Sequence, residues 1–257
     1  MSPELTLGVI LAGAVVLQWV AFVPAYLART ERFYDLTGSL TYLSAVAAGL
    51  LLAPDRGLRE WVLAAMVAVW AARLGTFLAR RIHKDGKDGR FDEIKQSAPR
   101  FFVAWTLQGL WVSLTALTVL IVLTTPSDPG LGVLDAVGWT LWGLGFGLEV
   151  VADHQKSAFR ARGTGRWIDE GVWSWSRHPN YLGEIVLWTG ICVSAASTFS
   201  GWRWVGVVSP LFVTFLLTRV SGVPMLEERA DGKWGGDPDY EAYKERVPVL
   251  LPRFGRS

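Results

Sequence analysis

Residues 101–125 read FFVAWTLQGLWVSLTALTVLIVLTT and contain no charged side chain. A helix needs about 20 mostly apolar residues to cross the roughly 30 Å hydrocarbon core of a bilayer. This stretch is long enough to do so. It therefore predicts a transmembrane helix, and it sets the class of fold for the chain.

The apolar residues elsewhere in the chain, which is 51% hydrophobic, gather into further runs of similar length. We expect spans over approximately residues 5–28, 36–52, 60–80, 101–125, 131–152, 179–198 and 203–220. The first run lacks a positive leader and is too long for a signal peptide, so we expect a retained helix. The sequence predicts an all-α, polytopic membrane protein with seven transmembrane helices.

Composition excludes several classes of function. The net charge of +2 is too small to indicate a nucleic-acid partner. The single cysteine, Cys192, permits no disulfide within the chain and no thiolate metal cluster, and we expect it to pack inside an apolar run. The three histidines, His83, His154 and His178, lack the spacing of metal ligands. We expect no metal.

The positive charges predict the topology. When the gaps between spans are numbered alternately, 21 of the 25 lysines and arginines fall in one set of gaps and three in the other, while Arg73 lies inside a span. Segments rich in Lys and Arg stay in the cytoplasm. We therefore expect the N-terminus outside and the C-terminus in the cytoplasm, together with the segments 80–100 and 156–177.

The motif SRHPNYLGE, residues 176–184, opens the sixth span. Pro179 suits the first turn of a helix, where its missing N–H needs no partner. Asn180 and Glu184 are four residues apart and share a face. A helix cap at the membrane interface, with Tyr181 in the aromatic belt, would explain the proline and the tyrosine. It would not explain Glu184, because an ionisable residue about a turn deep in a span indicates a functional site.

The segment before this motif is also polar. Glu149 and Asp153 share one face of a continuing fifth helix, with Lys156 and Arg160 one or two turns later. In RGTGRW, residues 162–167, backbone N–H groups beside the glycines are candidates for binding a phosphate. By contrast, we expect GLGFG at 143–147 to serve helix packing through small residues.

Two other polar segments each allow two interpretations. The 80–100 loop is either a solvated loop or one wall of a site for an anionic ligand, where Arg or Lys would meet phosphate. In the tail, we expect a short amphipathic helix with Tyr240 and Tyr243 three residues apart, followed by VPVLLP against the membrane surface. These aromatics argue against a disordered tail.

These motifs carry a resemblance. RHPNYLGE after a basic segment, followed by the acidic pair Glu227 and Glu228, a tyrosine-rich helix and LLPRFG, resembles a superfamily of membrane reductases and methyltransferases. It includes the steroid 5α-reductases, the sterol C14 reductases and the isoprenylcysteine carboxyl methyltransferases. FYDLTGSLTY at 33–42 and WAARLGTFLARRI at 70–82 resemble the bacterial branch of the steroid 5α-reductase family. The resemblance covers essentially the whole chain.

The resemblance implies a single reductase domain over residues 1–257, in a bacterial inner membrane, with substrate-side helices over about 1–125 and the cofactor side over about 126–257. It implies that NADPH reduces the 4,5 double bond of a 3-oxo-4-ene steroid or similar lipophilic enone, with the cofactor on the cytoplasmic side. The positions that match cofactor contacts, some more loosely than others, are Asn180, Glu184, Asp153, Arg160, Glu149, Trp167, Arg81, Lys84, Arg177, Tyr181, Tyr240 and Tyr243. A carboxylate and an amide together satisfy the donors and the acceptor of a nicotinamide carboxamide.

The resemblance also implies groups that stabilise the negative charge developing on the carbonyl oxygen of the substrate. Asp35 and Tyr34 match the polar pair on the second helix of the family, and Trp70 falls where relatives have a tyrosine. A buried Asp35 would act as a neutral acid. Alternatively, Asp35 caps the second helix. An indole N–H can donate a hydrogen bond but not a proton, so Trp70 leaves the polarity of the substrate open.

Two other classes of function remain. One is a methyltransferase that uses S-adenosylmethionine and a lipid or prenylated acceptor, which would share the 176–184 motif. The other is a lipid or sterol binder without catalysis. For the reductase, the expected partners are a lipophilic enone and membrane lipid, and a monomer is compatible with the sequence.

Overall fold

A computed structural model of the chain describes residues 1–53, 56–126 and 129–252, apart from the side chains of residues 84, 85 and 90. Every regular element within these ranges is helical, which confirms the all-α class. The chain divides into two compact units: residues 1–135 with 195–209, and residues 136–194 with 210–257. We call them unit 1 and unit 2 and describe each by itself.

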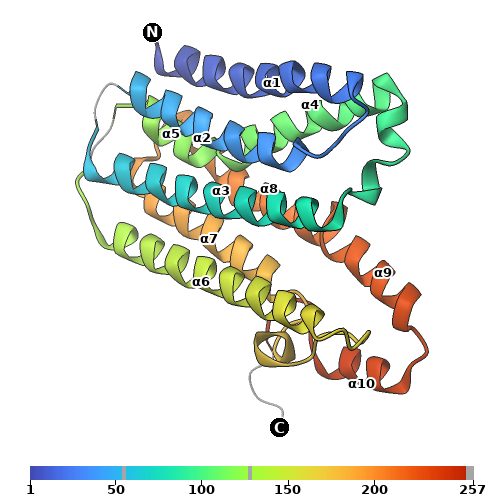
Figure 1. Ribbon diagram of the computed structural model, residues 1–257. Coiled ribbons are helices and arrows are strands. Elements are labelled where there is room, and N and C mark those ends of the chain that lie inside the picture. The colour runs from blue at the N-terminus through green and yellow to red at the C-terminus, as the bar shows by residue number, and fades with distance from the viewer. Residues whose placement is uncertain (54–55, 127–128, 253–257) are drawn as a thin grey trace. The chain divides into compact units, whose positions relative to one another are not determined.

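Unit 1 contains the first five α-helices (Figure 1). They are α1 (Pro3–Leu27), α2 (Tyr34–Leu52), α3 (Leu58–Asp85), α4 (Ala98–Thr115) and α5 (Leu117–Thr124), with the short 3₁₀ turns η1 (Gly89–Phe91), η2 (Ile94–Gln96), η4 (Ala196–Thr198) and η5 (Gly201–Val207). Helix α2 packs between α1 and α3, and α4 packs along α1.

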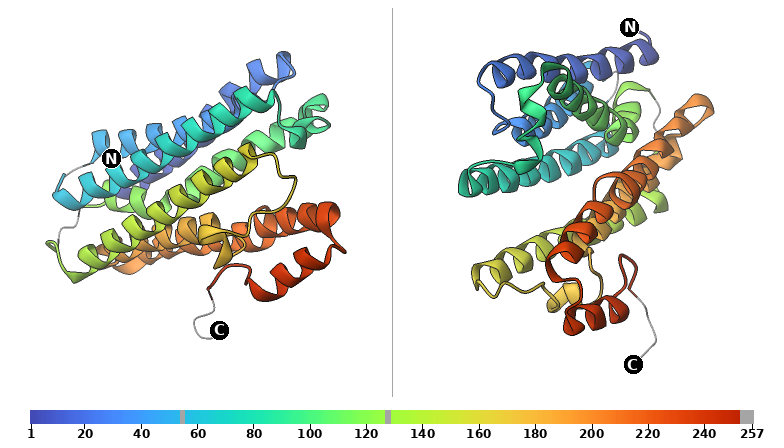
Figure 2. Two further views of the ribbon diagram at one scale, coloured as in Figure 1. Left: turned by 60° about the horizontal axis from the view of Figure 1, so that its bottom comes forward. Right: turned by 90° about the vertical axis from the view of Figure 1, so that its right-hand side faces the viewer.

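Unit 2 contains most of the remaining helices (Figures 1 and 2). They are α6 (Val133–Ala161), the 3₁₀ turn η3 (Gly171–Ser174), α7 (Pro179–Ala195), α8 (Val208–Phe215), the π-helical turn η6 (Leu216–Val220), α9 (Val223–Trp234) and α10 (Pro238–Arg246). The first residues of α6 and α8 are grouped with unit 1.

Among the described residues, six helical segments are long and apolar enough to cross a membrane: residues 3–27, 34–52, 58–83, 98–124, 179–198 and 201–234. They identify the chain as an integral, multi-pass membrane protein. Helix α6 covers the predicted fifth span but is not among the six. Two acidic residues and five glycines dilute the apolar residues along its expected span, residues 131–152. A seventh span and the orientation of the termini therefore remain predictions.

Glycines bring α6 and α7 together, as their sequence predicts. A Cβ added at Gly145 would lie 2.6 Å from the carbonyl oxygen of Gly183, and one added at Gly190 would lie 2.6 Å from that of Gly138. Real Cβ atoms do not approach backbone so closely, so only glycine fits at these crossings. The prediction of small-residue packing by GLGFG is confirmed at Gly145, whereas Gly143 and Gly147 face no neighbouring atom within 4 Å. The two helices run side by side in all views (Figures 1 and 2).

A buried ion pair fixes one end of unit 1. The guanidinium of Arg59 binds the Asp135 carboxylate through two nitrogens, at 2.8 and 2.9 Å. A third bond from this guanidinium reaches the carbonyl oxygen of Gly130 at 2.5 Å, and both charged side chains are 1–2% exposed. The two partners are 76 residues apart, so no local sequence pattern predicts this contact.

Candidate functional site

The RHPN motif lies where a short loop enters α7. The helix begins at Pro179, as predicted. Ser176 and His178 before it are buried, and Asn180 and Glu184 on the first two turns are partly buried. Gly183 packs against α6, so the start of α7 is held close to the end of α6 that carries Glu149 and Asp153. This packing brings polar groups from two helices together within unit 2.

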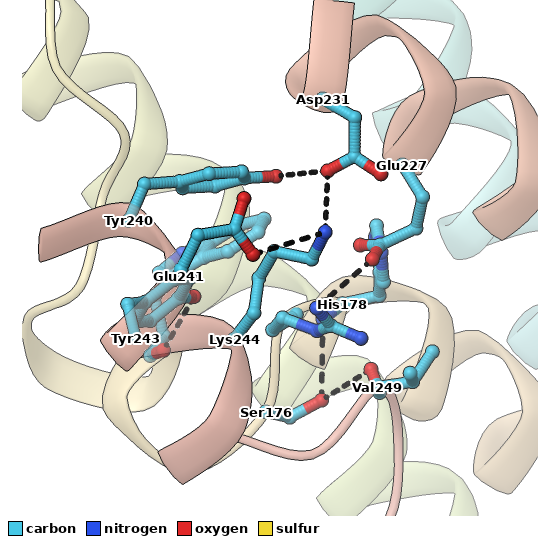
Figure 3. A network of polar contacts seen from close by, with 11 residues as sticks. Ser176, His178, Glu227, Asp231, Tyr240, Glu241, Tyr243, Lys244 and Val249 are labelled. Atoms are coloured by element: carbon cyan, nitrogen blue, oxygen red, sulfur yellow. Dashed lines mark hydrogen bonds and ion pairs between the residues drawn. The ribbon is translucent and has the colours of Figure 1, made fainter. Parts of the chain in front are cut away.

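Arg177 and His178 both bind Glu227 of α9, and Figure 3 shows the contact of His178. Nη1 of Arg177 lies 3.0 Å from Oε2 of Glu227, and Nε2 of His178 lies 2.7 Å from Oε1. His178 is only 4% exposed. This burial lowers the pKa of the imidazole below its ordinary 6.5, although the neighbouring carboxylate opposes the shift. His178 is therefore neutral at physiological pH.

The C-terminal tail binds this same segment. The backbone N–H of Arg177 donates to the carbonyl of Pro248 at 2.9 Å, and that of His178 donates to the carbonyl of Val249 at 3.2 Å. The Ser176 hydroxyl also donates to Val249, at 3.2 Å (Figure 3). We expected VPVLLP to lie against the membrane surface, and this is wrong for the side chain of Val247, which is buried within the protein. For the rest of the segment it stays a prediction, while the carbonyls of Pro248 and Val249 pair with backbone N–H groups of the motif.

The predicted tail helix is confirmed as α10, and both of its tyrosines are buried. The Tyr243 hydroxyl donates to the carbonyl of Trp173 at 3.1 Å, and the Tyr240 hydroxyl donates to Asp231 at 3.0 Å. Burial raises the pKa of each phenol far above its ordinary value of 10, so both keep their protons. Their rings pack with Trp167 and Val247 in one apolar cluster. The tyrosines therefore anchor the tail to the loop before α7.

Asp153 and Lys156 extend the polar surface along α6. Nδ2 of Asn180 lies 3.4 Å from Oδ1 of Asp153, which brings two predicted cofactor residues into contact. Nζ of Lys156 lies 4.5 Å from the centre of the Trp173 ring. Burial, with repulsion from Arg160, lowers the pKa of Lys156 from 10.5 to about 8. Lys156 is still mostly protonated at pH 7.

The RGTGRW loop adopts the turns that its glycines predict. Gly163 and Gly165 have φ of +66° and +72°, a left-handed conformation that favours glycine. Both of its arginines are ion-paired within unit 2, Arg162 with Glu170 and Arg166 with Asp239. Arg160, at the end of α6, is exposed to solvent.

Three further predicted residues lie near the α6–α7 packing. Glu149 is buried, with 4% exposure, one helical turn before Asp153. The Tyr181 ring stacks on the His178 imidazole with centroids 5.7 Å apart. Glu184 is partly buried on α7, one turn after Asn180.

The other predicted residues belong to unit 1. Asp35 lies in the first turn of α2, and the N-cap residue is Phe33, so the capping interpretation of Asp35 is wrong. Its carboxylate lies 3.6 Å from the guanidinium of Arg81 on α3. The Tyr34 hydroxyl donates to the carbonyl of Ala104 at 2.9 Å. The side chain of Lys84 lies outside the described residues.

Asp35 and Trp70 do not meet. Along the α2–α3 contact, Asp35 faces Arg81, while the Trp70 ring is edge-on to Tyr42 with centroids 5.1 Å apart. Asp35 and Tyr42 are seven residues apart, about 10 Å along the helix at 1.5 Å per residue. The structure thus places a buried phenol, Tyr42, beside the tryptophan. Tyr42 was not among the predicted residues, because the family tyrosine was expected on the third helix.

The 80–100 loop is tied to unit 1 by ion pairs. Glu31, which is 4% exposed, accepts hydrogen bonds from Nζ of Lys95 at 2.7 Å and from the backbone N–H of Asp88 at 3.0 Å. Lys87 pairs with Asp92 at 2.6 Å. Several of its cations thus have carboxylate partners within the unit, as in a folded surface loop.

Four buried polar atoms around the RHPN motif have no hydrogen-bond partner in the part of the chain that the structure describes. They are Nε of Arg177, Nδ1 of His178, Oδ1 of Asn180 and Nε1 of Trp167. Burying such groups unpaired is costly, so they are candidates for binding a ligand. Donors, acceptors, and the cations Lys156 and Arg160 in one unit fit the amide, hydroxyl and phosphate groups of a dinucleotide.

Comparison with known families identifies the family of the chain. A family model described as "Protein of unknown function (DUF1295)" matches residues 21–247. The chain therefore belongs to the DUF1295 family, which is steroid 5α-reductase-like. This confirms the resemblance at family level, and the bacterial branch remains a prediction.

One relative is the uncharacterized protein C594.04c of Schizosaccharomyces pombe, which is 24% identical over 234 residues. The match covers 77% of this chain and 65% of the yeast protein, so the chain spans about two thirds of the length of that relative. No solved structure was found to match the chain.

Proposed function

We propose that the protein is an NADPH-dependent reductase of a lipophilic enone, such as a 3-oxo-4-ene steroid. In the proposed reaction a hydride from the dihydronicotinamide forms a C–H bond at the β-carbon, and a proton from solvent adds at the α-carbon. The carbon–carbon double bond becomes single, and NADPH becomes NADP⁺. The set of unpartnered buried polar atoms at the RHPN motif is the observation that supports a bound dinucleotide most directly.

We assign the dinucleotide to unit 2. Asn180 and Glu184 are the proposed contacts of the nicotinamide carboxamide, because an amide oxygen and a carboxylate accept from its N–H groups. The ammonium of Lys156 and the exposed guanidinium of Arg160 are proposed to bind phosphate. Arg81 and Lys84 belong to unit 1, and their role as phosphate contacts stays a prediction from the sequence.

We assign polarisation of the substrate carbonyl to unit 1. Charge that develops on this oxygen is stabilised by hydrogen-bond donors fixed in a dry environment. Tyr42 joins the predicted Trp70 as a candidate donor, since its phenol is only 5% exposed beside Trp70. Asp35 is ion-paired with Arg81 and, as a carboxylate, can only accept, and the Tyr34 hydroxyl already donates to a backbone carbonyl. Tyr42→Phe should lower kcat at least about tenfold if this phenol donates to the carbonyl oxygen in the transition state. Unchanged kcat would remove Tyr42 from the proposal.

The test uses detergent-purified full-length protein with progesterone or testosterone and NADPH. We expect the cofactor absorbance to fall as a product two hydrogen masses heavier than the substrate appears. Asn180→Ala and Glu184→Ala should abolish this consumption while the protein stays folded. Methyl transfer from labelled S-adenosylmethionine would instead support a methyltransferase. Steroid binding without turnover would support a lipid or sterol binder. Either result would overturn the reductase.

A further inference from the structure

The contact between His178 and Glu227 defines which imidazole nitrogen carries the proton. Glu227 also binds the guanidinium of Arg177 through its second oxygen, at 3.0 Å, so it is an ionised carboxylate that can only accept. Nε2 of His178, 2.7 Å from the other oxygen, must therefore donate. Because the imidazole is buried and neutral, Nδ1 then has a lone pair and no proton.

This lone pair belongs to a small set of polar atoms on consecutive residues. Nδ1 of His178 and Oδ1 of Asn180 are acceptors, and Nε of Arg177 is a donor. Each is buried, and none has a hydrogen-bond partner among the described residues. Nδ2 of Asn180 already faces Asp153, which leaves Oδ1 as the acceptor.

We propose that Glu227 is a positioning residue that holds His178 as the Nε2–H tautomer, so that Nδ1, together with the amide oxygen of Asn180, accepts hydrogen bonds from the bound dinucleotide. The ligand group is an N–H or O–H donor, either the carboxamide of the nicotinamide or a ribose hydroxyl. The binding part of this inference rests on the proposed function. The tautomer part rests on the geometry and burial of His178 and does not depend on the proposed function.

The charged groups around the imidazole are consistent with a neutral ring. Arg177 precedes it, Lys156 approaches from α6, and both disfavour a second positive charge. Glu227 from α9 favours one, but burial outweighs it. Its backbone is also fixed, since the His178 N–H binds Val249 of the tail and the Ser176 hydroxyl oxygen. The ring therefore has little freedom to exchange its two nitrogens.

The tautomer can be measured directly. The chain has only three histidines, so a ¹⁵N-histidine spectrum of the full-length protein in detergent contains few signals, and those of His178 are assigned by their loss in His178→Asn. We expect a protonated Nε2 and an unprotonated Nδ1 in the wild type, and a mixture of tautomers in Glu227→Ala. Glu245→Ala, an exposed carboxylate on α10, should match the wild type. A protonated Nδ1, or a spectrum unaltered by Glu227→Ala, would overturn the positioning role.

Two substitutions separate the nitrogens in binding. His178→Asn places an amide oxygen near the position of Nδ1, whereas His178→Gln places its amide near that of Nε2. From quenching of tryptophan fluorescence by NADPH, we expect a Kd within about threefold of wild type for His178→Asn and raised about tenfold or more for His178→Gln, the usual scale of one buried hydrogen bond. Equal affinities, or the reverse order, would overturn the acceptor role.

A cofactor analogue identifies which group of the dinucleotide donates the hydrogen bond to Nδ1 of His178. In 3-acetylpyridine adenine dinucleotide phosphate, a methyl group replaces the amide nitrogen. If the carboxamide binds Nδ1, the penalty of His178→Gln disappears with this analogue. If a ribose hydroxyl binds it, the penalty persists. A wild-type protein that shows no saturable binding of NADPH would overturn the proposed function and the acceptor role, while the tautomer spectra would still decide the role of Glu227.

Discussion

A Cβ added at Gly183 on α7 would lie 2.5 Å from the carbonyl oxygen of Gly145 on α6. The contact is reciprocal, since a Cβ at Gly145 would lie 2.6 Å from the carbonyl oxygen of Gly183. Asn180 lies one turn before Gly183, and Glu149 lies one turn after Gly145. The closest approach of the two helices thus sets the position of the proposed dinucleotide contacts.

Gly183→Ala should therefore destabilise unit 2. The added methyl group would force the backbones apart, at a cost of about 1–3 kcal/mol for overpacking. Thermal unfolding in detergent measures this loss. Gly143→Ala is the matched control on α6, because nothing lies within 4 Å of its Cβ and alanine favours a helix. If both variants unfold at the same temperature as the wild type, the glycine contact does not hold α6 and α7 together.

Arg59 and Asp135 form a buried ion pair, and the effect on stability of replacing one residue should depend on whether the other is present. Arg59→Met leaves the Asp135 carboxylate buried without its counter-ion and should cost about 3–5 kcal/mol. The double variant Arg59→Met with Asp135→Leu should be more stable than this single variant, because it removes both charges. Chemical unfolding of the three proteins in one detergent gives the comparison. A double variant less stable than Arg59→Met would contradict the account.

Lys156 should make stability rise with pH. Its pKa is lowered from 10.5 to about 8 in the folded protein. Between these values the unfolded chain binds one more proton than the folded chain, so the free energy of unfolding increases as pH rises through this window. Lys156→Met should flatten this rise in unfolding experiments from pH 7 to 10. Lys87→Met, an exposed lysine in unit 1, is the control, and a slope that survives in Lys156→Met would refute the assignment.

The tail should be required for binding at the RHPN motif. A chain that ends at Arg246 lacks the carbonyls that accept from the backbone N–H groups of Arg177 and His178. It also lacks the buried side chain of Val247. We expect at least about a tenfold loss of NADPH affinity, on the scale of losing buried hydrogen bonds. A chain that ends at Pro252 keeps these contacts and should bind as the full chain does. Equal binding by both truncated chains would exclude a role for the tail.

Local features of the fold could be predicted from the sequence because their causes are local. A run of apolar residues such as 101–125 forms a helix that can span the bilayer wherever it occurs in the chain. Pro179 begins α7 because it needs no N–H partner, and the glycine spacing predicted close helix packing.

Contacts between distant residues could not be predicted in this way. His178 and Glu227 are 49 residues apart, and neither residue type alone indicates the other. Tyr42 contacts Trp70 only because the packing of α2 against α3 places these two residues opposite each other. The polarity of α6 is intermediate, so composition does not decide whether it crosses the membrane. The ion pair of Asp35 with Arg81 likewise depends on the packing of α2 against α3.

Transfer of deuterium from cofactor to product tests the central claim most directly. The purified protein is given testosterone or progesterone with NADPH deuterated at C4 of the dihydronicotinamide, once for each face of the ring. We expect the deuterium from one face to appear on the carbon β to the ketone, and we expect Asn180→Ala and Glu184→Ala to abolish the transfer. A reduced product without deuterium from either face, or no reduced product at all, would contradict it.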